Sequence, residues 1–512
     1  MGALEEKVKA LVSGIQAVQT NDGVNSTKQA PAAHVAIADV VRFGEKLVLP
    51  ENMKIDDAIS MLQRQKKYDE EVVVLTREVP CFPWDGALAM TNAMKHLFGW
   101  VNAEPIPTMF GELPPKIIQV EVGYARKQGV PWGQFSLPGV NGVVSTGYAM
   151  NGNPQMVQFK MTAKVRRLDS AAVTKLFDLT EQYVQESSIY RGQAIKIRFT
   201  NQDGEPCDLP MPQFLDLSQV KTNELVYSKD IQASVETNLF TLLDHTEACR
   251  RAGIPLKRGI LFEGPYGVGK SLAARCTAKK ATDNGWTYLY CERADELDRM
   301  VKFAHQYQPA VIFCEDIDRV VAGERSTRMD DVLNIIDGIE SKGTEIVIVL
   351  TTNFVGRINK AMLRPGRLDA IISIRPPDAE AVQRLIMQYS RGQLAIQNEA
   401  DMETLCAVGQ KLAGKVPAVI RECVERAKLS ALKLSGGQDT VITPAALLDS
   451  AISMDGQFRI MTATETQRMI VETREDVIRN LGESLVRGLL PTANELLEEA
   501  RAGAGEDAGT ND

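Results

Sequence analysis

The sequence predicts an α/β domain with a buried parallel sheet over residues 223–375, preceded by an α+β region and followed by helices. Short apolar runs alternate there with helical stretches, and the runs are apolar on both faces, as parallel strands buried between helices are. Two of the runs also end in polar motifs of distinctive spacing. The strand candidates are 260–262, 287–290, 311–314, 346–350 and 370–374.

The first 215 residues predict a separate α+β domain, either single or divided into subdomains 1–110 and 111–215. An amphipathic helix over 4–18 and a polar linker over 20–31 open it. The expected helices are 55–66, 86–98 and 169–187, and the expected strands are 117–122, 133–136, 142–148, 156–165 and 194–200. The last long run, 156–165, alternates apolar and polar residues, which is typical of a half-buried strand. The Pro- and Asp-rich stretch 203–214 is the expected domain boundary.

Helical patterns dominate after residue 378. They predict a helical domain over 376–455, in which Thr443 caps a helix that has Pro444 at its first position. Further charged amphipathic helices are expected over 456–500. The small, acidic residues 501–512 predict a disordered tail.

Length and composition limit the function. A chain of 512 residues has room for about three domains. The net charge of −8 argues against a protein that coats nucleic acid by bulk electrostatics. The eight cysteines are scattered without a C-x-x-C pair, which favours free thiols in a reducing compartment over disulfides or zinc. With no signal-peptide pattern and no apolar run of ~18 residues, we expect a soluble cytoplasmic protein without a membrane span.

The first motif is a phosphate-binding loop after the strand 260–262. The pattern G-x-x-x-x-G-K-S is complete from Gly264 to Ser271. Glycines let the backbone N–H groups bend around phosphate oxygens, and the helix that follows presents its positive end to the anion. Lys270 supplies a charge for the β- and γ-phosphates, and Ser271 a hydroxyl for Mg²⁺. The expected nucleotide-binding residues are Gly264, Pro265, Tyr266, Gly267, Val268, Gly269, Lys270, Ser271 and Leu272.

The second motif is a group of carboxylates at the end of the apolar strand 311–314. Glu315, Asp316 and Asp318 follow this strand directly. In phosphoryl-transfer enzymes, carboxylates at the carboxyl end of a strand beside the phosphate loop hold Mg²⁺ and orient the attacking water. Asp318 can instead cap the next helix. We therefore expect ATP and Mg²⁺ to bind here, with Ser271 and Glu315 on the metal.

A third segment makes the sequence resemble the AAA family of ATPases, within the AAA+ class of P-loop proteins. It comprises Leu350–Asn353 and the run Leu-Arg-Pro-Gly-Arg-Leu-Asp at 363–369. The resemblance covers about 225–455 and implies that 402–434 belongs to a helical lid, with 414–426 closing over the nucleotide. It implies ATP hydrolysis in a homo-oligomer, a ring hexamer in this family, with each nucleotide at a subunit interface.

The resemblance also implies roles for three residues. Asn353 would position the attacking water, and Arg364 would reach into the neighbouring subunit's site as an arginine finger, with Arg367 as its companion. The chemistry requires such groups, because charge spreads over the γ-phosphoryl oxygens in the transition state. For the lid, Arg421 is the weak candidate for an additional arginine on the nucleotide.

Two features depart from the family pattern. The family reads Asp-Glu where this chain reads Glu315-Asp316, so each carboxylate differs in length by one methylene. Our hypothesis is that Asp316 remains the catalytic base and Glu315 the metal-side acid. In addition, the segment after 287–290 lacks the aromatic–apolar–Gly loop with which threading members line a pore. Tyr288 and Tyr290 are interpreted as core strand residues, and polypeptide threading is the output that the sequence supports least.

The expected function is an ATP-driven motor that remodels a protein or protein assembly, recognised through residues 1–215. A nucleic-acid motor is the first alternative, through the basic residues of 164–167 or 324–328, although ordinary surface charge explains both. A nucleotide-gated scaffold with weak hydrolysis is the second, because of the exchanged carboxylates. Trp84 and Trp132 are expected to be packing anchors.

Overall fold

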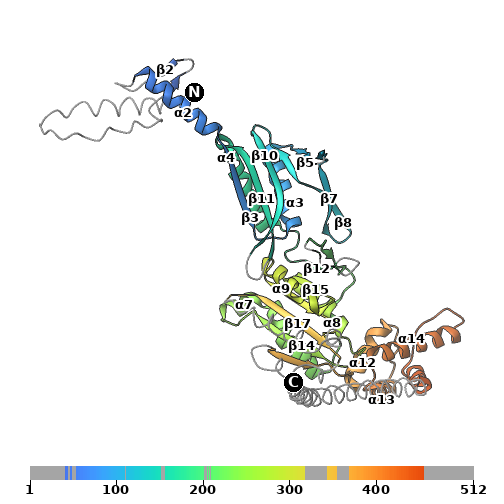
Figure 1. The fold of residues 1–512 in the computed structure, drawn as a ribbon. Helices are drawn as coiled ribbons and strands as arrows, with labels where there is room; N and C mark the ends of the chain where they lie inside the picture. Colours follow the sequence, from blue (N-terminus) through green and yellow to red (C-terminus); the bar gives the residue numbers. More distant parts are fainter. Residues whose placement is uncertain are drawn as a thin grey trace, which may run out of the picture.

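The computed structural model contains a five-stranded β-sheet, a seven-stranded β-sheet and, beside the latter, a group of helices (Figure 1). It describes residues 41–43, 46–48, 54–109, 111–151, 156–200, 205, 207, 209–317, 343–353 and 368–454. Several predictions lie outside these ranges: the helix 4–18, the linker 20–31, the loop 324–328, Asp318, Arg364, Arg367, the helices over 456–500 and the tail 501–512.

The N-terminal sheet has five antiparallel strands in the order β3-β11-β10-β9-β4. These are β3 (Val72–Val79), β11 (Met156–Arg166), β10 (Gly142–Asn151), β9 (Gln134–Ser136) and β4 (Asn102–Glu104). The alternation predicted for 156–165 is confirmed, because Phe159, Met161, Ala163 and Val165 are all fully buried. Those side chains face the helices α3 (Pro83–Phe98) and α4 (Ser170–Ser187), which pack against β11.

Smaller elements surround this sheet. They are α2 (Ile55–Glu70) and three antiparallel pairs: β1 (Val41–Phe43) with β2 (Lys46–Val48), β5 (Ile106–Thr108) with β6 (Gly111–Leu113), and β7 (Lys116–Gly123) with β8 (Arg126–Trp132). Trp84 and Trp132 pack edge to face with ring centroids 5.2 Å apart, so their interpretation as packing anchors is confirmed.

The second sheet has seven strands in the order β13-β12-β15-β16-β17-β14-β18. The five predicted strands are present as β14 (Arg258–Glu263), β15 (Thr287–Cys291), β16 (Ala310–Cys314), β17 (Ile346–Thr352) and β18 (Ala370–Ser373), and their pairing is parallel. Its helices are α5 (Lys229–Val235), α6 (Thr241–Asp244), α7 (Thr246–Arg251), α8 (Lys270–Asp283) and α9 (Leu297–Gln306), with a π-helical turn at Glu236–Phe240. Alternate residues of the central strands enter two different cores, so both faces are covered.

The predicted domain boundary at 203–214 is wrong. β12 (Ala194–Lys196) pairs in parallel with β15, and β13 (Gln213–Phe214) pairs antiparallel with β12. Both strands therefore extend the parallel sheet instead of completing the N-terminal domain. The sequence does not reveal this because the register of Ile195 with Leu289 joins residues far apart in the chain.

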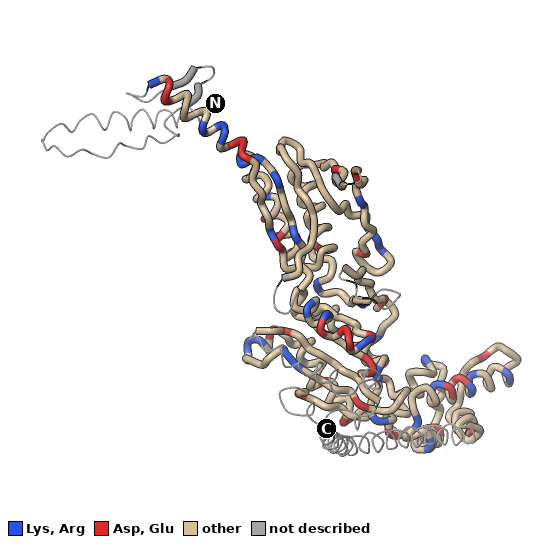
Figure 2. The backbone as a smooth tube through the Cα atoms, in the orientation of Figure 1, with Lys and Arg blue, Asp and Glu red and all other residues tan. Residues whose placement is uncertain are grey.

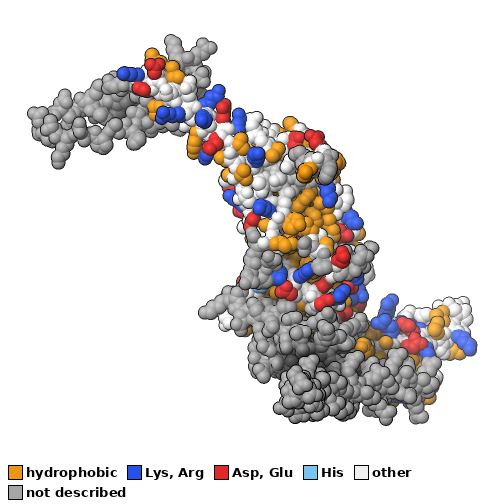
Figure 3. Space-filling view, in the orientation of Figure 1, with side chains coloured by type: hydrophobic (Ala, Val, Ile, Leu, Met, Phe, Trp, Pro, Cys, Tyr) orange, Lys and Arg blue, Asp and Glu red, His pale blue; other side chains and the backbone are white. Residues whose placement is uncertain are grey.

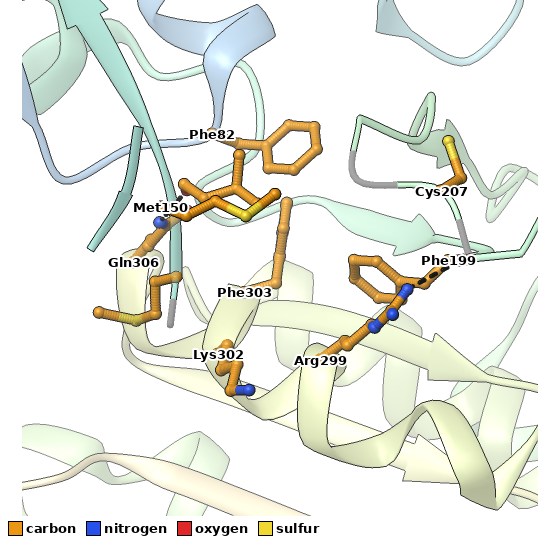
Figure 4. A pocket seen from close by; sticks show the side chains of 10 residues that line it. Phe82, Met150, Phe199, Cys207, Arg299, Lys302, Phe303 and Gln306 are labelled. Carbon is orange, nitrogen blue, oxygen red and sulfur yellow. Dashed lines mark hydrogen bonds between the residues drawn. The ribbon is translucent and has the colours of Figure 1, made fainter. Parts of the chain in front are cut away.

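The two sheets share a continuous apolar core. Phe82 at the start of α3 packs on Phe303 of α9, with ring centroids 5.3 Å apart, and its backbone N–H donates to Tyr307 Oη at 2.8 Å. A cavity of about 200 Å³ lies at the same junction (Figure 4) and is lined by residues of both halves, among them Met150 and Arg299. The N-terminal half is thus docked on the sheet face that α9 covers.

A buried carboxyl group lies at this junction. Asp85 of α3 is 2% exposed and accepts hydrogen bonds from Ser188 Oγ at 2.6 Å and from the backbone N–H of Ile189 at 3.0 Å. Burial raises the pKa of Asp85 to about 6, and the hydrogen bond from Ser188 opposes the rise.

The predicted helical domain contains α12 (Ala379–Ser390), α13 (Glu399–Leu412), α14 (Pro417–Leu434) and a helix over 444–454. The Thr443 cap is confirmed, because its hydroxyl accepts from the backbone N–H of Ala446 at 3.3 Å. All eight cysteines are free thiols. Among the described helices, none combines the length and the apolar character that a membrane crossing requires.

The raised pKa of Asp85 predicts a pH dependence of stability. The stability that depends on protonated Asp85 is fully present below about pH 4 and is lost as the pH rises through about 6. Between pH 5 and pH 7.5, the free energy of unfolding of Asp85→Asn should therefore rise by about 1–3 kcal/mol relative to that of the wild type. Urea unfolding followed by tryptophan fluorescence measures the gain, since Trp84 adjoins the site. An equal pH dependence in both proteins would contradict this assignment.

Candidate nucleotide-binding site

The glycine-rich loop joins β14 to α8 at the carboxyl edge of the parallel sheet. Gly264 has φ 156°, and a Cβ there would lie 2.1 Å from the carbonyl oxygen of Ile374. Gly269 has φ 104° and is the N-cap of α8. Only glycine fits both positions without strain. The loop therefore delivers the first N–H groups of α8 to a common point, where they can bind an anion.

Lys270 is the first residue of α8 and is only 7% exposed. Its Nζ donates to the carbonyl oxygens of Gly264 at 2.7 Å and Pro265 at 2.9 Å, and to Asn353 Oδ1 at 2.8 Å. Three acceptors satisfy the buried ammonium. The bond to Asn353 links the end of β14 to the end of β17.

Asn353 also connects to the carboxylate motif. Its Nδ2 donates to Asp316 Oδ1 at 3.0 Å, so Lys270, Asn353 and Asp316 form a chain of hydrogen bonds across the ends of β14, β17 and β16. The structure therefore brings together three residues that were predicted from three separate segments of the sequence.

The two adjacent carboxylates leave β16 in different directions. The backbone N–H of Glu315 donates to the Cys291 carbonyl on the β15 side at 3.2 Å, whereas that of Asp316 donates to Thr351 Oγ1 on the β17 side at 2.9 Å. Asp316 has φ 49°, a left-handed conformation that is uncommon for aspartate and concentrated at functional sites.

Glu315 is held by the neighbouring strand. Its Oε2 accepts from Tyr290 Oη at 2.7 Å, and burial together with this bond raises the pKa of Tyr290, which keeps the phenol a donor. Glu315 Oε1 is buried and has no hydrogen-bond partner among the described residues. Glu315 lines a cavity of about 340 Å³ that Ser271 also lines.

A buried carboxylate oxygen without a partner among the described residues, on a side chain that lines the same cavity as Ser271, fits the oxygen ligands of Mg²⁺. Within the described ranges, no group of three His, Cys, Asp or Glu residues forms a closed metal cage. Mg²⁺ usually takes one or two protein ligands and the substrate's phosphates, which this arrangement permits.

Two further side chains contact the loop, and the contact of Tyr227 was not predicted from the sequence. Tyr227, only 3% exposed, donates from Oη to the Gly269 carbonyl at 3.2 Å. Val416 packs on the loop, since a Cβ on Gly267 would lie 3.6 Å from Val416 Cβ. Val416 lies in the segment 414–426, for which the sequence predicts a place over the nucleotide.

The remaining loop residues differ in exposure. Val268 is buried, whereas Tyr266 is 56% exposed with its ring centroid 6.0 Å from Lys270 Nζ.

Three other residues with sequence-based predictions lie outside the loop. The guanidinium of Arg421, the candidate arginine of the lid, lies 5.1 Å from the ring centroid of Tyr389 within the lid. Tyr288 is buried as expected, but Tyr290 is half-buried and bonded to Glu315, a role that its strand position alone did not indicate.

The connection from β15 to α9 is short and held by charges. Glu292 pairs with Lys196 at 2.5 Å and with Arg198 at 2.8 Å, both from the β12 region, and Arg293 pairs with Asp295 at 2.6 Å. The connection carries no aromatic side chain. Ion pairs with Lys196 and Arg198 thus hold the segment in which a threading member of the family would carry an aromatic loop.

The basic residues 164–167 are largely neutralised. Arg166 pairs with Asp169 at 3.1 Å, and Arg167 pairs with Glu71 while its guanidinium stacks 4.1 Å from the Tyr68 ring centroid. Basic and acidic residues likewise alternate along α2 and around α9 (Figure 2). These contacts favour ordinary surface charge over a nucleic-acid interface.

Comparison with known proteins decides the family. Residues 260–376 match the model of the ATPase family associated with various cellular activities (AAA). This chain carries an AAA ATPase domain. The match begins in β14 and ends after β18, so it contains the loop, both carboxylates and Asn353.

The AAA domain is similar to parts of several known proteins. Protein SAV of Sulfolobus acidocaldarius is 32% identical over 176 residues, 31% of this chain and 22% of that protein. The cell division cycle protein 48 homolog of Archaeoglobus fulgidus is 28% identical over 34% of this chain and 25% of that protein. The 26S proteasome regulatory subunit 8 homolog of Schizosaccharomyces pombe is 29% identical over 37% of this chain and 50% of that protein. The chain thus spans half or less of the length of these relatives.

The hydrogen-bond chain predicts the effect of removing Asn353. Asn353→Ala takes away the amide that holds Asp316 and one of the three acceptors of Lys270. We expect turnover to fall about 100-fold, as the loss of one preorganised polar group does, with ADP affinity changed only severalfold. Phosphate release and fluorescent-ADP titration measure the two effects. Asn284→Ala, on the exposed end of α8, is the control and should match the wild type.

Proposed function

We propose that this AAA protein hydrolyses ATP and uses the energy to remodel or disassemble a protein or protein complex. One observation carries the proposal: Lys270, Asn353 and Asp316 form a continuous network on one side of the glycine-rich loop, while Glu315 faces the cavity of Ser271 on the other. An anion-binding loop, a general base and a metal-side carboxylate are the groups that phosphoryl transfer to water requires.

Each side chain has a definite part in this reaction. Lys270 neutralises charge on the β- and γ-phosphates. Asp316 accepts the proton of the attacking water, and Asn353 orients that water while keeping Asp316 in place. Glu315 and Ser271 would hold Mg²⁺, which when bound neutralises the charge that develops on the phosphate oxygens.

We further propose that the site is completed by a second copy of the chain in a ring, a hexamer by family resemblance. Arg364 and Arg367, which lie outside the described residues, are the groups that would enter the neighbouring site. The proposal draws on the resemblance and on the names of relatives, one of which is a subunit of the 26S proteasome.

The N-terminal half is the proposed contact with the target. Apolar side chains gather on its visible face between β10 and β7 (Figure 3). Ile117 of β7 is 67% exposed, and Tyr148 of β10 is 43% exposed. An apolar exposed surface on an acidic chain suits a protein partner better than a nucleic acid. The charged, ion-paired connection after β15 favours remodelling from this surface over threading through a pore.

The first test separates binding from hydrolysis in the full chain. Asp316→Asn should lower steady-state ATPase activity by about 100-fold or more, because the general base is lost, and keep ATP affinity within severalfold. Lys270→Ala should lower both. Asp298→Asn on α9, whose carboxylate pairs only at the surface with Lys302, is the matched control. Turnover that persists in Asp316→Asn would refute the assignment, and wild-type turnover no higher than that of Lys270→Ala would favour a nucleotide-gated scaffold.

The second test addresses the shared site. Arg364→Ala and Lys270→Ala chains should each be inactive in isolation. Mixed in equal amounts, they should recover about a quarter of the wild-type activity, because some intact loops then adjoin an intact Arg364. Phosphate release after subunit exchange measures the recovery. A mixture as inactive as its components would place Arg364 in its own subunit's site or outside the site.

A further inference from the structure

Tyr290 is the one described side chain that hydrogen-bonds the Glu315 carboxylate. Its Oη lies 2.7 Å from Glu315 Oε2, while Glu315 Oε1 is buried and has no partner among the described residues. We propose that Tyr290 is a positioning residue that allows a glutamate, instead of the shorter aspartate, to serve as the metal-side ligand. The inference rests on the proposed function and concerns the Mg²⁺ site of that same reaction.

The extra methylene of glutamate creates the need for such a residue. Glutamate at 315 has one more rotatable bond than aspartate, so its carboxylate can occupy more positions unless a neighbour holds it. A bond to one oxygen selects one position and directs the other oxygen elsewhere. Because Glu315 lines a cavity shared with Ser271 and its Oε1 has no partner among the described residues, the selected position is the one that serves a cation.

The strand that carries Tyr290 is rigid enough for this purpose. β15 lies between β12 and β16, and Tyr290 is in register with Lys196 on one side and Phe313 on the other. Its neighbours Leu289 and Cys291 are fully buried. A donor mounted on an internal strand holds its partner more precisely than one on a loop. β15 is an internal strand of the sheet because β12 pairs with it on the side opposite β16.

A tyrosine that positions Glu315 differs in one respect from a purely structural tyrosine. An aspartate at 315 would end roughly 1.5 Å short of the Glu315 oxygens, one carbon–carbon bond, and would lose the bond to Tyr290. The contribution of Tyr290 to metal binding should therefore depend on whether position 315 holds a glutamate or an aspartate. Restoring the order Asp-Glu should make the phenol dispensable.

The first experiment measures metal binding without turnover. Mn²⁺, a spectroscopic substitute for Mg²⁺, is titrated into the full chain bound to ADP and followed by electron paramagnetic resonance. Tyr290→Phe should weaken Mn²⁺ binding about 5- to 20-fold, and ADP affinity in EDTA should stay within twofold. Tyr288→Phe, on the same strand and lining the same cavity, should leave Mn²⁺ affinity unchanged. Unchanged Mn²⁺ affinity in Tyr290→Phe would overturn the proposal.

The second experiment tests the dependence on carboxylate order. In the chain with Glu315→Asp and Asp316→Glu, adding Tyr290→Phe should change Mn²⁺ affinity less than twofold. An equal loss in both backgrounds would show a general structural role and overturn the proposal. Glu315→Asp alone provides the same comparison if the doubly exchanged chain does not fold. Because the measurement needs no hydrolysis, a wild type that binds Mn²⁺ and ADP but lacks ATPase activity would refute the proposed function and leave this inference standing.

Discussion

The hydrogen bond from Lys270 to Asn353 is the interaction on which the site depends. It joins an ammonium at the start of α8 to an amide at the end of β17, and the same amide holds Asp316 at the end of β16. A buried cation is costly unless acceptors surround it, and the two loop carbonyls and Asn353 supply them. The parallel sheet makes this possible because it brings the carboxyl ends of β14, β16 and β17 to one edge.

The same edge separates two carboxylates that are adjacent in the sequence. Glu315 is directed toward β15 by its bonds with Cys291 and Tyr290, and Asp316 toward β17 by its bonds with Thr351 and Asn353. Their environments differ accordingly: one oxygen of Glu315 has no hydrogen-bond partner in the described part of the chain, whereas Asp316 belongs to a polar network. The direction in which each residue leaves β16 thus assigns the metal-side role to Glu315 and the base role to Asp316. Neighbours such as Tyr290 then position the longer side chain of Glu315.

Sequence patterns predicted the parts of the molecule that are locally determined. The apolar runs identified the five central strands, and glycine spacing identified the loop in which Gly264 and Gly269 adopt positive φ. Contacts between distant segments that carry no motif were not predictable. β12 has the sequence of an ordinary strand, and only its register with β15 places it in the parallel sheet. Tyr227 carries no motif, and it reaches the loop only because the chain folds back on it.

A structure of the full chain with Mg²⁺ and a non-hydrolysable ATP analogue, determined by electron cryomicroscopy, tests the central claim most directly. The account predicts a cation bound by Ser271 and Glu315, with Tyr290 still bonded to the second oxygen of Glu315. Asp316 and Asn353 should face the terminal phosphate on the β17 side. A cation bound by Asp316, with Glu315 facing the terminal phosphate, would contradict the division of roles between the two carboxylates.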